Sequence, residues 1–158
     1  MANDETKSAG TKPPRLSLAQ RRRARRLLLQ ALYQWQIADS EILDIIKQFR
    51  DENPGKMDWE YFEEVITAIP KESSNMDTLL APLLDRAIKS LDPIERALLY
   101  LGTFELAHRM DVPYRVVINE AVELAKMFGA TESHKYINGV LDKLAPVLRP
   151  IELKQKHG

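Results

Sequence analysis

Apolar residues recur at spacings of three and four along most of the chain, which is the period of an α-helix. The first such stripe follows Leu18, has Ser17 as a candidate N-cap, and consists of Ala24, Leu28, Ala31, Leu32 and Trp35. Similar stripes predict helices over about 41–49, 58–70, 76–91, 92–109 and 111–128, and a last one from 131 or 133 that Pro146 and Pro150 bound. No segment alternates with a period of two for long. The pattern predicts an all-α fold of about seven helices without a sheet.

Prolines, glycines and capping residues mark the ends of these helices. Asn53-Pro54-Gly55 breaks the chain, Asp58 caps the helix that follows, and Pro70 is expected to end it. Asp92-Pro93 is a strong helix start, with Asp at the N-cap and Pro at the first helical position. Gly129 stands where a helix C-terminus favours glycine.

The length and the polar ends predict one domain with a tail on each side. The 158 residues suffice for one domain and leave little room for a second. Residues 1–15 are polar and lack a helical period, so they are expected to form a disordered tail. Residues 16–150 are expected to form the helical domain, and residues 151–158 a C-terminal tail.

The composition argues against an enzyme and against a metal or cofactor site. The chain has no cysteine, which excludes disulfides and thiolate chemistry, and its three histidines are far apart in sequence. Neither a glycine-rich phosphate loop nor a nucleophile elbow occurs. No apolar run approaches the roughly 18–20 residues of a membrane span, and no apolar signal-peptide core precedes Leu16. We therefore expect a soluble cytoplasmic protein without catalytic residues, cofactor or membrane partner.

The charges are segregated although the formal net charge is zero. Residues 7–38 carry eight basic side chains and no acidic one, whereas residues 39–125 carry eighteen acidic and nine basic side chains. Five basic residues share less than two turns of the first predicted helix: Arg21, Arg22, Arg23, Arg25 and Arg26. Their mutual repulsion is relieved by a polyanion, whose phosphates guanidinium groups match and whose bases they can stack on. The cluster indicates an RNA-binding helix; the alternative is a solvated helix start behind a basic tail.

A second polar group surrounds the start of the last predicted helix: Glu132, Ser133, His134, Lys135 and Tyr136. A helix N-terminus offers free N–H groups to a phosphate, Lys135 adds a full charge, and the Tyr136 ring offers a face to a base. An ordinary capped helix explains the same residues without a ligand. Tyr33 lies off the buried stripe of the first helix, so it either contacts a partner or packs under a neighbouring helix.

Four blocks of this sequence resemble the NusB family of bacterial transcription antitermination factors. They are R-R-R-A-R-R at 21–26, A-L-Y-Q-W-Q at 31–36, V-P-Y-R-V-V-I-N-E-A-V-E-L-A-K at 112–126 and F-G-A-T-E-S-H-K-Y-I-N-G-V-L-D-K at 128–143. The resemblance covers roughly residues 21–150, and the last two blocks are long, gapless and specific. The polar tail before Leu16 is not explained by it.

The resemblance implies two packed three-helix bundles in a perpendicular arrangement. It also implies binding of the boxA element in ribosomal RNA leader transcripts, together with NusE, which is also a small-subunit ribosomal protein. The resemblance further implies that this pair joins a complex on RNA polymerase that suppresses termination. By resemblance, the arginine-rich helix and the Glu132–Tyr136 segment carry RNA, and Tyr33 and Glu95 lie at the NusE interface. The residues alone say of Glu95 only that an acid suits the first turn of a helix.

Two other functions fit a helical module with an arginine cluster. The same module forms the RNA-binding front of ribosomal RNA cytosine methyltransferases, but no catalytic domain is expected because the chain stops at Gly158. The other is a structural adaptor whose arginines contact acidic proteins or membrane headgroups. An RNA titration against an equally charged polyanion separates the adaptor from an RNA-binding protein.

Overall fold

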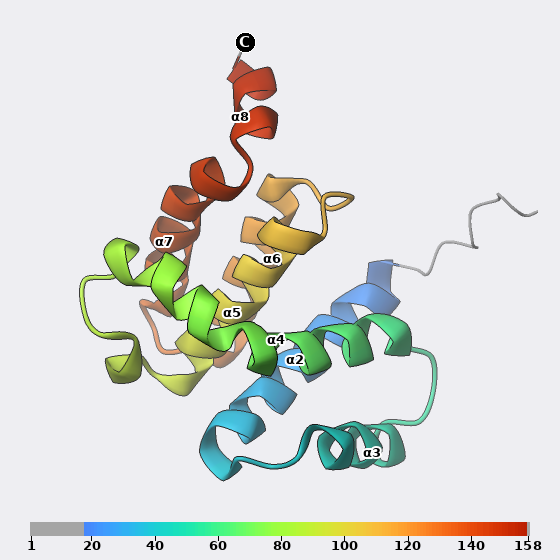
Figure 1. Ribbon diagram of the computed structural model, residues 1–158. Helices are drawn as coiled ribbons and strands as arrows, with labels where there is room; N and C mark the ends of the chain where they lie inside the picture. The colour runs from blue at the N-terminus through green and yellow to red at the C-terminus, as the bar shows by residue number, and fades with distance from the viewer. Residues whose placement is uncertain (1–17, 158) are drawn as a thin grey trace, which may run out of the picture.

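The computed structural model describes residues 18–157, and this part of the chain is folded into helices (Figure 1). Its seven α-helices are α2 (Leu18–Ala38), α3 (Ile42–Glu52), α4 (Trp59–Leu80), α5 (Pro93–His108), α6 (Tyr114–Phe128), α7 (Ser133–Leu148) and α8 (Pro150–His157). Two short 3₁₀ turns, η1 (Ala81–Leu83) and η2 (Ile88–Ser90), lie between α4 and α5. The predicted all-α class is confirmed, since none of the described residues lies in a strand; the tail expected at 1–15 falls outside them. Within the same range, no helix is long and apolar enough to cross a membrane.

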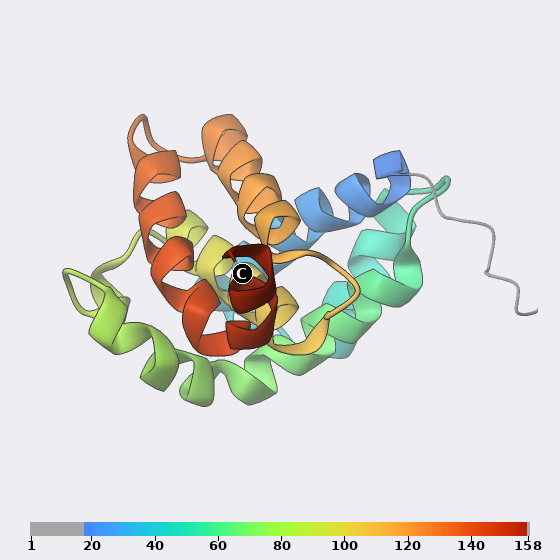
Figure 2. The same cartoon turned by 90° about the horizontal axis from the view of Figure 1, so that it is seen from above.

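The helices form two groups of three. α2, α3 and α4 pack on one another, and so do α5, α6 and α7. α5 joins the groups because it also packs against α2 and α4. Figure 2 shows α4 running along one side of the molecule past both groups, and η1 beyond its end contacts α7. This arrangement confirms the two packed helical bundles that the resemblance implied.

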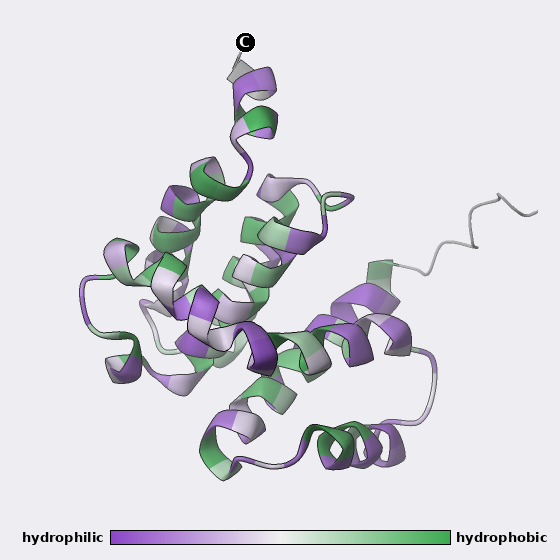
Figure 3. Ribbon diagram, viewed as in Figure 1, coloured by the Kyte–Doolittle hydropathy of each residue, from purple (hydrophilic) through white to green (hydrophobic). Residues whose placement is uncertain are grey.

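The buried face of α2 follows the predicted stripe. Its solvent-inaccessible members are Ala24, Leu28, Ala31 and Leu32. Trp35 packs against Tyr100 of α5, with ring centroids 6.5 Å apart. Burial of each large aliphatic side chain contributes about 1.5–3 kcal/mol to folding, so this face holds α2 against α4 and α5. Figure 3 shows the hydrophilic band that the arginines add near the start of α2.

The prediction that a helix ends at Pro70 is wrong. α4 continues through Pro70 to Leu80, and the helix predicted over 76–91 is instead the end of α4 followed by η1 and η2. A proline inside a helix costs about 3 kcal/mol because it removes one hydrogen bond and crowds the preceding turn. Ile69 and Met76 are both buried, so the core contacts on either side of Pro70 offset that cost. Pro146 likewise lies inside α7 rather than at its end.

Local capping explains the starts of α4 and α5. The carboxylates of Asp58 and Asp92 accept hydrogen bonds from the backbone N–H groups of Tyr61 and Ile94, as the sequence predicts. At the start of α7, however, the N-cap is Glu132 rather than Thr131 or Ser133, and no side chain caps it. Gly129 ends α6 without a positive φ; a Cβ there would lie 2.8 Å from the carbonyl oxygen of Ala125. The glycine is therefore required by a close approach.

Residues 151–157, expected to be part of a tail, form most of α8. The helix begins directly after Arg149, whose guanidinium is buried and donates to the backbone carbonyls of Glu105, Leu106 and Arg109. Arg149 also pairs with Glu152 of α8, and Glu152 accepts the backbone N–H of Tyr114. The start of α8 thus binds the last turn of α5 and the first turn of α6.

Candidate nucleic-acid interface

The outer arginines of α2 are held by groups from distant parts of the chain. Arg21 Nε lies 2.8 Å from Asp58 Oδ2, and its guanidinium carbon lies 4.5 Å from the centre of the Tyr61 ring. Arg22 Nε lies 3.1 Å from Glu120 Oε2 on α6, while 53% of the Arg22 side chain stays exposed. These contacts fix the two side chains at the surface without removing them from solvent.

Arg23 and Arg26 lie on either side of this pair. Arg23 donates to the carbonyl oxygens of Lys56 and Pro54, at 2.9 and 3.4 Å, and so holds the loop before α4. Arg26 is half-buried and lines a groove between α2 and α6. The other groove residues are Arg22, Glu120, Glu123, Leu124 and Met127. We call Arg21, Arg22, Arg23 and Arg26 the basic face of α2.

Arg25 is a correction to the expected set of RNA-binding residues, because it points into the core. Only 3% of the residue is exposed, and its Nε lies 3.0 Å from Oε2 of the equally buried Glu105. The Tyr61 hydroxyl donates to the same Glu105 oxygen, and burial together with the Glu105 charge raises the pKa of Tyr61. A second carboxylate, Glu120, lies 3.8 Å from Arg25 Nη1. Arg25 is thus the cation of a buried network and is not accessible to a ligand.

The repulsion expected within the arginine cluster is largely relieved inside the protein. Three carboxylates each face a guanidinium of α2. They belong to Asp58, which directly precedes α4, to Glu105 of α5 and to Glu120 of α6. The sequence around the arginine cluster does not predict these carboxylates, because they lie 37 to 98 residues away from their partners. The positive charge available to a ligand therefore comes from the basic face of α2. Arg22 is the most exposed arginine of this face.

The second predicted cluster forms a corner where α7 and α5 begin. Ser133 is 2% exposed, and its hydroxyl donates a hydrogen bond of 2.7 Å to Glu95 Oε2. Lys135 is 70% exposed and lies 3.0 Å from Glu132 Oε1, also at the surface. His134 is half-buried. Lys135 can therefore reach a ligand, whereas the Ser133 hydroxyl is already committed to Glu95.

The Tyr136 ring is half-buried and packs against the core. The guanidinium carbon of Arg86 lies over this ring, 4.8 Å from its centre. Arg86 is fixed in turn by Asp85, with Nε–Oδ1 and Nη2–Oδ2 distances of 2.7 and 3.1 Å. The Tyr136 hydroxyl is buried and makes no hydrogen bond of ordinary geometry, and burial raises its pKa. We call Glu95, Ser133, Lys135, Tyr136, Asp85 and Arg86 the α7 corner.

Sequence reasoning missed Asp85 and Arg86. Both lie in the segment that was expected to be helical and that in fact connects η1 to η2. An Asp-Arg pair inside a predicted amphipathic helix has the pattern of a solvated face. Only the turn of the chain after Leu83 brings Arg86 onto Tyr136, fifty residues further along.

The two expected partner residues lie on neighbouring elements. Tyr33 on α2 is 41% exposed and lines a groove with Ile37 of the same helix and Phe49 of α3, so it is not covered by another helix. Glu95 is half-buried in the first turn of α5. Gln36 Nε2 donates to the carbonyl of Pro93 at 3.0 Å and so ties the end of α2 to the start of α5.

The comparison with protein families decides the assignment. The model of the NusB family matches residues 22–146, which is most of the chain. The chain belongs to the NusB family. Both halves of the fold lie in the matched region, and so do all the residues of the α7 corner.

Individual NusB proteins are similar over nearly their whole length. The transcription antitermination protein NusB of Pseudomonas fluorescens Pf-5 is 54% identical over 137 residues, which cover 86% of this chain and 82% of that protein. The NusB of Marinomonas sp. is 48% identical over 98% of this chain and 91% of its own. These relatives are named for transcription antitermination and not for an enzymatic reaction.

Solved NusB structures share the fold. T. maritima NusB superposes with a TM-score of 0.76 at 31% identity, over 84% of this chain and 96% of that one. A chain from the crystal structure of the antitermination factors NusB and NusE in complex with dsRNA has a TM-score of 0.75 at 23% identity, over 83% of this chain and 99% of that one. The NusB fold is therefore common to all three chains.

Proposed function

We propose that this protein is a transcription antitermination factor that binds the boxA element of ribosomal RNA leader transcripts together with NusE. The observation that carries the proposal is the presence of two ligand-accessible groups, the basic face of α2 and the α7 corner, on a NusB fold. The names of the relatives support a role in transcription antitermination. The solved complex of NusB, NusE and dsRNA supports NusE and RNA as the partners. The factor acts in the cytoplasm, as part of the antitermination complex on RNA polymerase.

The two groups divide the work of RNA binding by their chemistry. Arg22, Arg26 and Lys135 are accessible cations that contact phosphates, with Arg21 and Arg23 beside them. Tyr136 adds an aromatic ring to the corner, which supports the stacking of a base freed from pairing. Arg25 and Ser133 act by holding this surface in place, since both are buried.

NusE docks on the surface that carries Tyr33 and Glu95. Tyr33 is an exposed aromatic side chain beside a groove, a residue type enriched in protein interfaces. The acidic excess of residues 39–125 repels RNA and favours a basic protein. Because Glu95 also belongs to the α7 corner, a bound NusE lies next to the bound RNA, and the joint surface makes more phosphate contacts than either protein alone.

The decisive experiment is a titration of single-stranded boxA RNA with this protein, with and without NusE, at two salt concentrations. For single strands the logarithm of the binding constant falls with log salt by about 0.7 per phosphate contact. Three to five contacts give a slope of roughly −2 to −3.5, and NusE should steepen it. A flat salt dependence, or equal binding of RNA and of an unrelated polyanion of the same charge, contradicts the proposal.

A further inference from the structure

We propose that Arg86 is a base-stacking residue of the RNA surface, so that a base, the Arg86 guanidinium and the Tyr136 ring form one continuous stack. This inference rests on the proposed function and names a contact within the same surface. The observation behind it is the position of the guanidinium carbon, 4.8 Å from the centre of the Tyr136 ring. On that side a base cannot reach the ring directly, because the arginine already covers it.

The outer side of Arg86 is open and its orientation is fixed. The side chain is 46% exposed, and the residues on either side of it, Asp85 and Ala87, are also exposed. Two parallel contacts to Asp85, at 2.7 and 3.1 Å, hold the guanidinium by its side. A planar cation fixed in this way loses little freedom when a second planar group stacks on it.

Charge at the corner favours a base over a phosphate as the ligand of Arg86. The Asp85 carboxylate already compensates the guanidinium, and the Glu95 carboxylate also acts on it. A phosphate could use only the guanidinium N–H groups that Asp85 leaves free, and it would approach two carboxylates there. A base carries no net charge and offers a π-face, which stacks on guanidinium planes in RNA complexes. The contact is therefore expected to depend little on salt.

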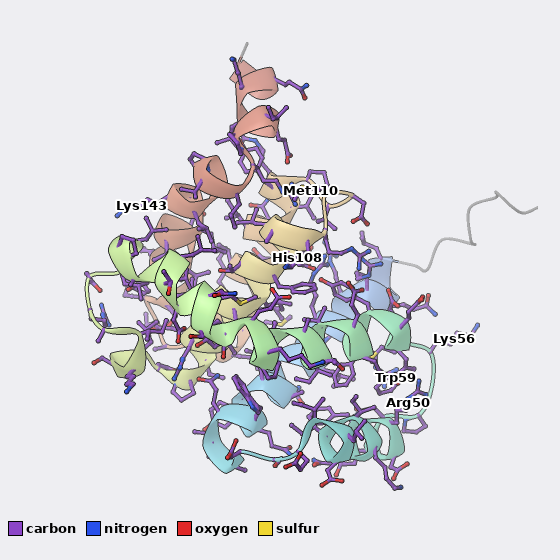
Figure 4. The ribbon with its side chains drawn as sticks, in the orientation of Figure 1. Arg50, Lys56, Trp59, His108, Met110 and Lys143 are labelled. Carbon is purple, nitrogen blue, oxygen red and sulfur yellow. The ribbon has the colours of Figure 1, made fainter. Side chains whose placement is uncertain are left out.

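The other three-helix group contains a matched control. Arg50 lies over the Trp59 ring at 5.0 Å, its guanidinium is 2.8 Å from Glu63, and its side chain is 50% exposed. Figure 4 shows Arg50 and Trp59 side by side near α3, at the opposite end of the molecule from α7. This triad has the same chemistry as Arg86, Tyr136 and Asp85 but lies away from the α7 corner.

The test compares Arg86→Lys with Arg50→Lys in titrations of single-stranded boxA RNA. Lysine keeps the charge and loses the plane, so a stacking role predicts that Arg86→Lys weakens binding about 5- to 50-fold at an unchanged salt slope. Arg50→Lys should bind RNA like the unsubstituted protein. Melting temperatures of both variants establish that they are folded.

A series of RNAs with one abasic position each then locates the base. If one base stacks on Arg86, the loss caused by Arg86→Lys disappears on the RNA that lacks that base and persists on the others. Unchanged binding by Arg86→Lys, or an equal loss on every abasic RNA, overturns the inference, since Arg86 would then only support Tyr136. Failure of the unsubstituted protein to bind RNA is a separate result, which removes the proposed function and this contact with it.

Discussion

The Ser133 hydroxyl donates a 2.7 Å hydrogen bond to Glu95 Oε2 and so joins the first turns of α7 and α5. The family resemblance implies two different surfaces for these residues, Ser133 with the RNA and Glu95 with the protein partner. Because Ser133 is buried, its hydroxyl can serve a ligand only by giving up Glu95. The pair therefore acts as a fixed joint between the two proposed binding surfaces.

Charge reversal at Glu95 tests the partner surface. We expect Glu95→Lys to abolish capture of NusE, since like charges in a close contact cost several kcal/mol. Glu95→Gln keeps an acceptor for Ser133 and is the control for loss of the hydrogen bond. Pull-down of NusE and the melting temperature are measured for both. Normal NusE capture by a stable Glu95→Lys protein would remove this residue from the interface.

Arg25 and Arg22 should respond to substitution in opposite ways. Arg25→Met leaves Glu105 as an uncompensated buried charge, so the free energy of unfolding should fall by about 3–5 kcal/mol. Arg22→Ala breaks an exposed pair and should change that free energy by less than about 0.5 kcal/mol, while the RNA salt slope becomes shallower by about 0.7. Denaturant unfolding and RNA titration measure the two effects. If Arg25→Met were stable and had a shallower RNA salt slope, Arg25 would have to be counted among the RNA-binding residues.

Two variants separate the Tyr136 ring from its hydroxyl. Tyr136→Ala should weaken RNA binding by about 1–3 kcal/mol through loss of stacking, and should also lower stability because the ring packs on the core. Tyr136→Phe keeps the ring and removes only the hydroxyl, which lies near Asp85 without a hydrogen bond of ordinary geometry, so RNA affinity should be retained and stability should change little. Binding is measured per folded molecule. Loss of RNA binding in the phenylalanine variant would assign the contact to the hydroxyl.

Lys135 provides the phosphate-binding counterpart in the same segment. Its side chain is 70% exposed, so Lys135→Ala should make the RNA salt slope shallower by about 0.7 and leave the melting temperature unchanged. The slope is obtained from titrations at several salt concentrations. An unchanged slope would show that the nearby Glu132 already neutralises the lysine.

The Arg149 guanidinium should be essential for stability. Arg149→Met removes its hydrogen bonds to three backbone carbonyls at the end of α5, and we expect the free energy of unfolding to fall by about 2–4 kcal/mol. Lys154→Ala, at an exposed position of α8, should change it by less than about 0.5 kcal/mol. Thermal and denaturant melts check both. Equal stability of the two variants would show that the Arg149 contacts do not stabilise the fold, as expected if residues 151–158 were only a tail.

Features that depend on neighbouring residues were predictable from the sequence. The stripe of α2 and the caps Asp58 and Asp92 follow from helical spacing and from side-chain chemistry within three residues. The burial of Arg25 also left a signal, because Leu28, Leu29 and Leu32 follow it by three, four and seven residues. The concentration of arginines concealed that signal.

Features that depend on tertiary packing were not predictable. Pro70 is locally a helix end, and only the buried contacts on both sides of it keep α4 continuous. Glu105 and Glu120 are 80 and 98 residues from the arginines that they neutralise. Arg86 reaches Tyr136 only because the chain turns between η1 and η2. Each of these contacts joins residues whose separation along the chain leaves no periodic pattern.

The continuity of α4 sets a distance as well as a shape. One unbroken helix packs against α2 and α5, and η1 at its end contacts α7, so the helix connects the basic face of α2 with the α7 corner. Under the proposed function, a single strand that uses both surfaces has to span the distance that α4 sets between them. We therefore expect a nucleotide inserted between the phosphate-binding and base-stacking positions to bulge out of the bound strand, whatever its base.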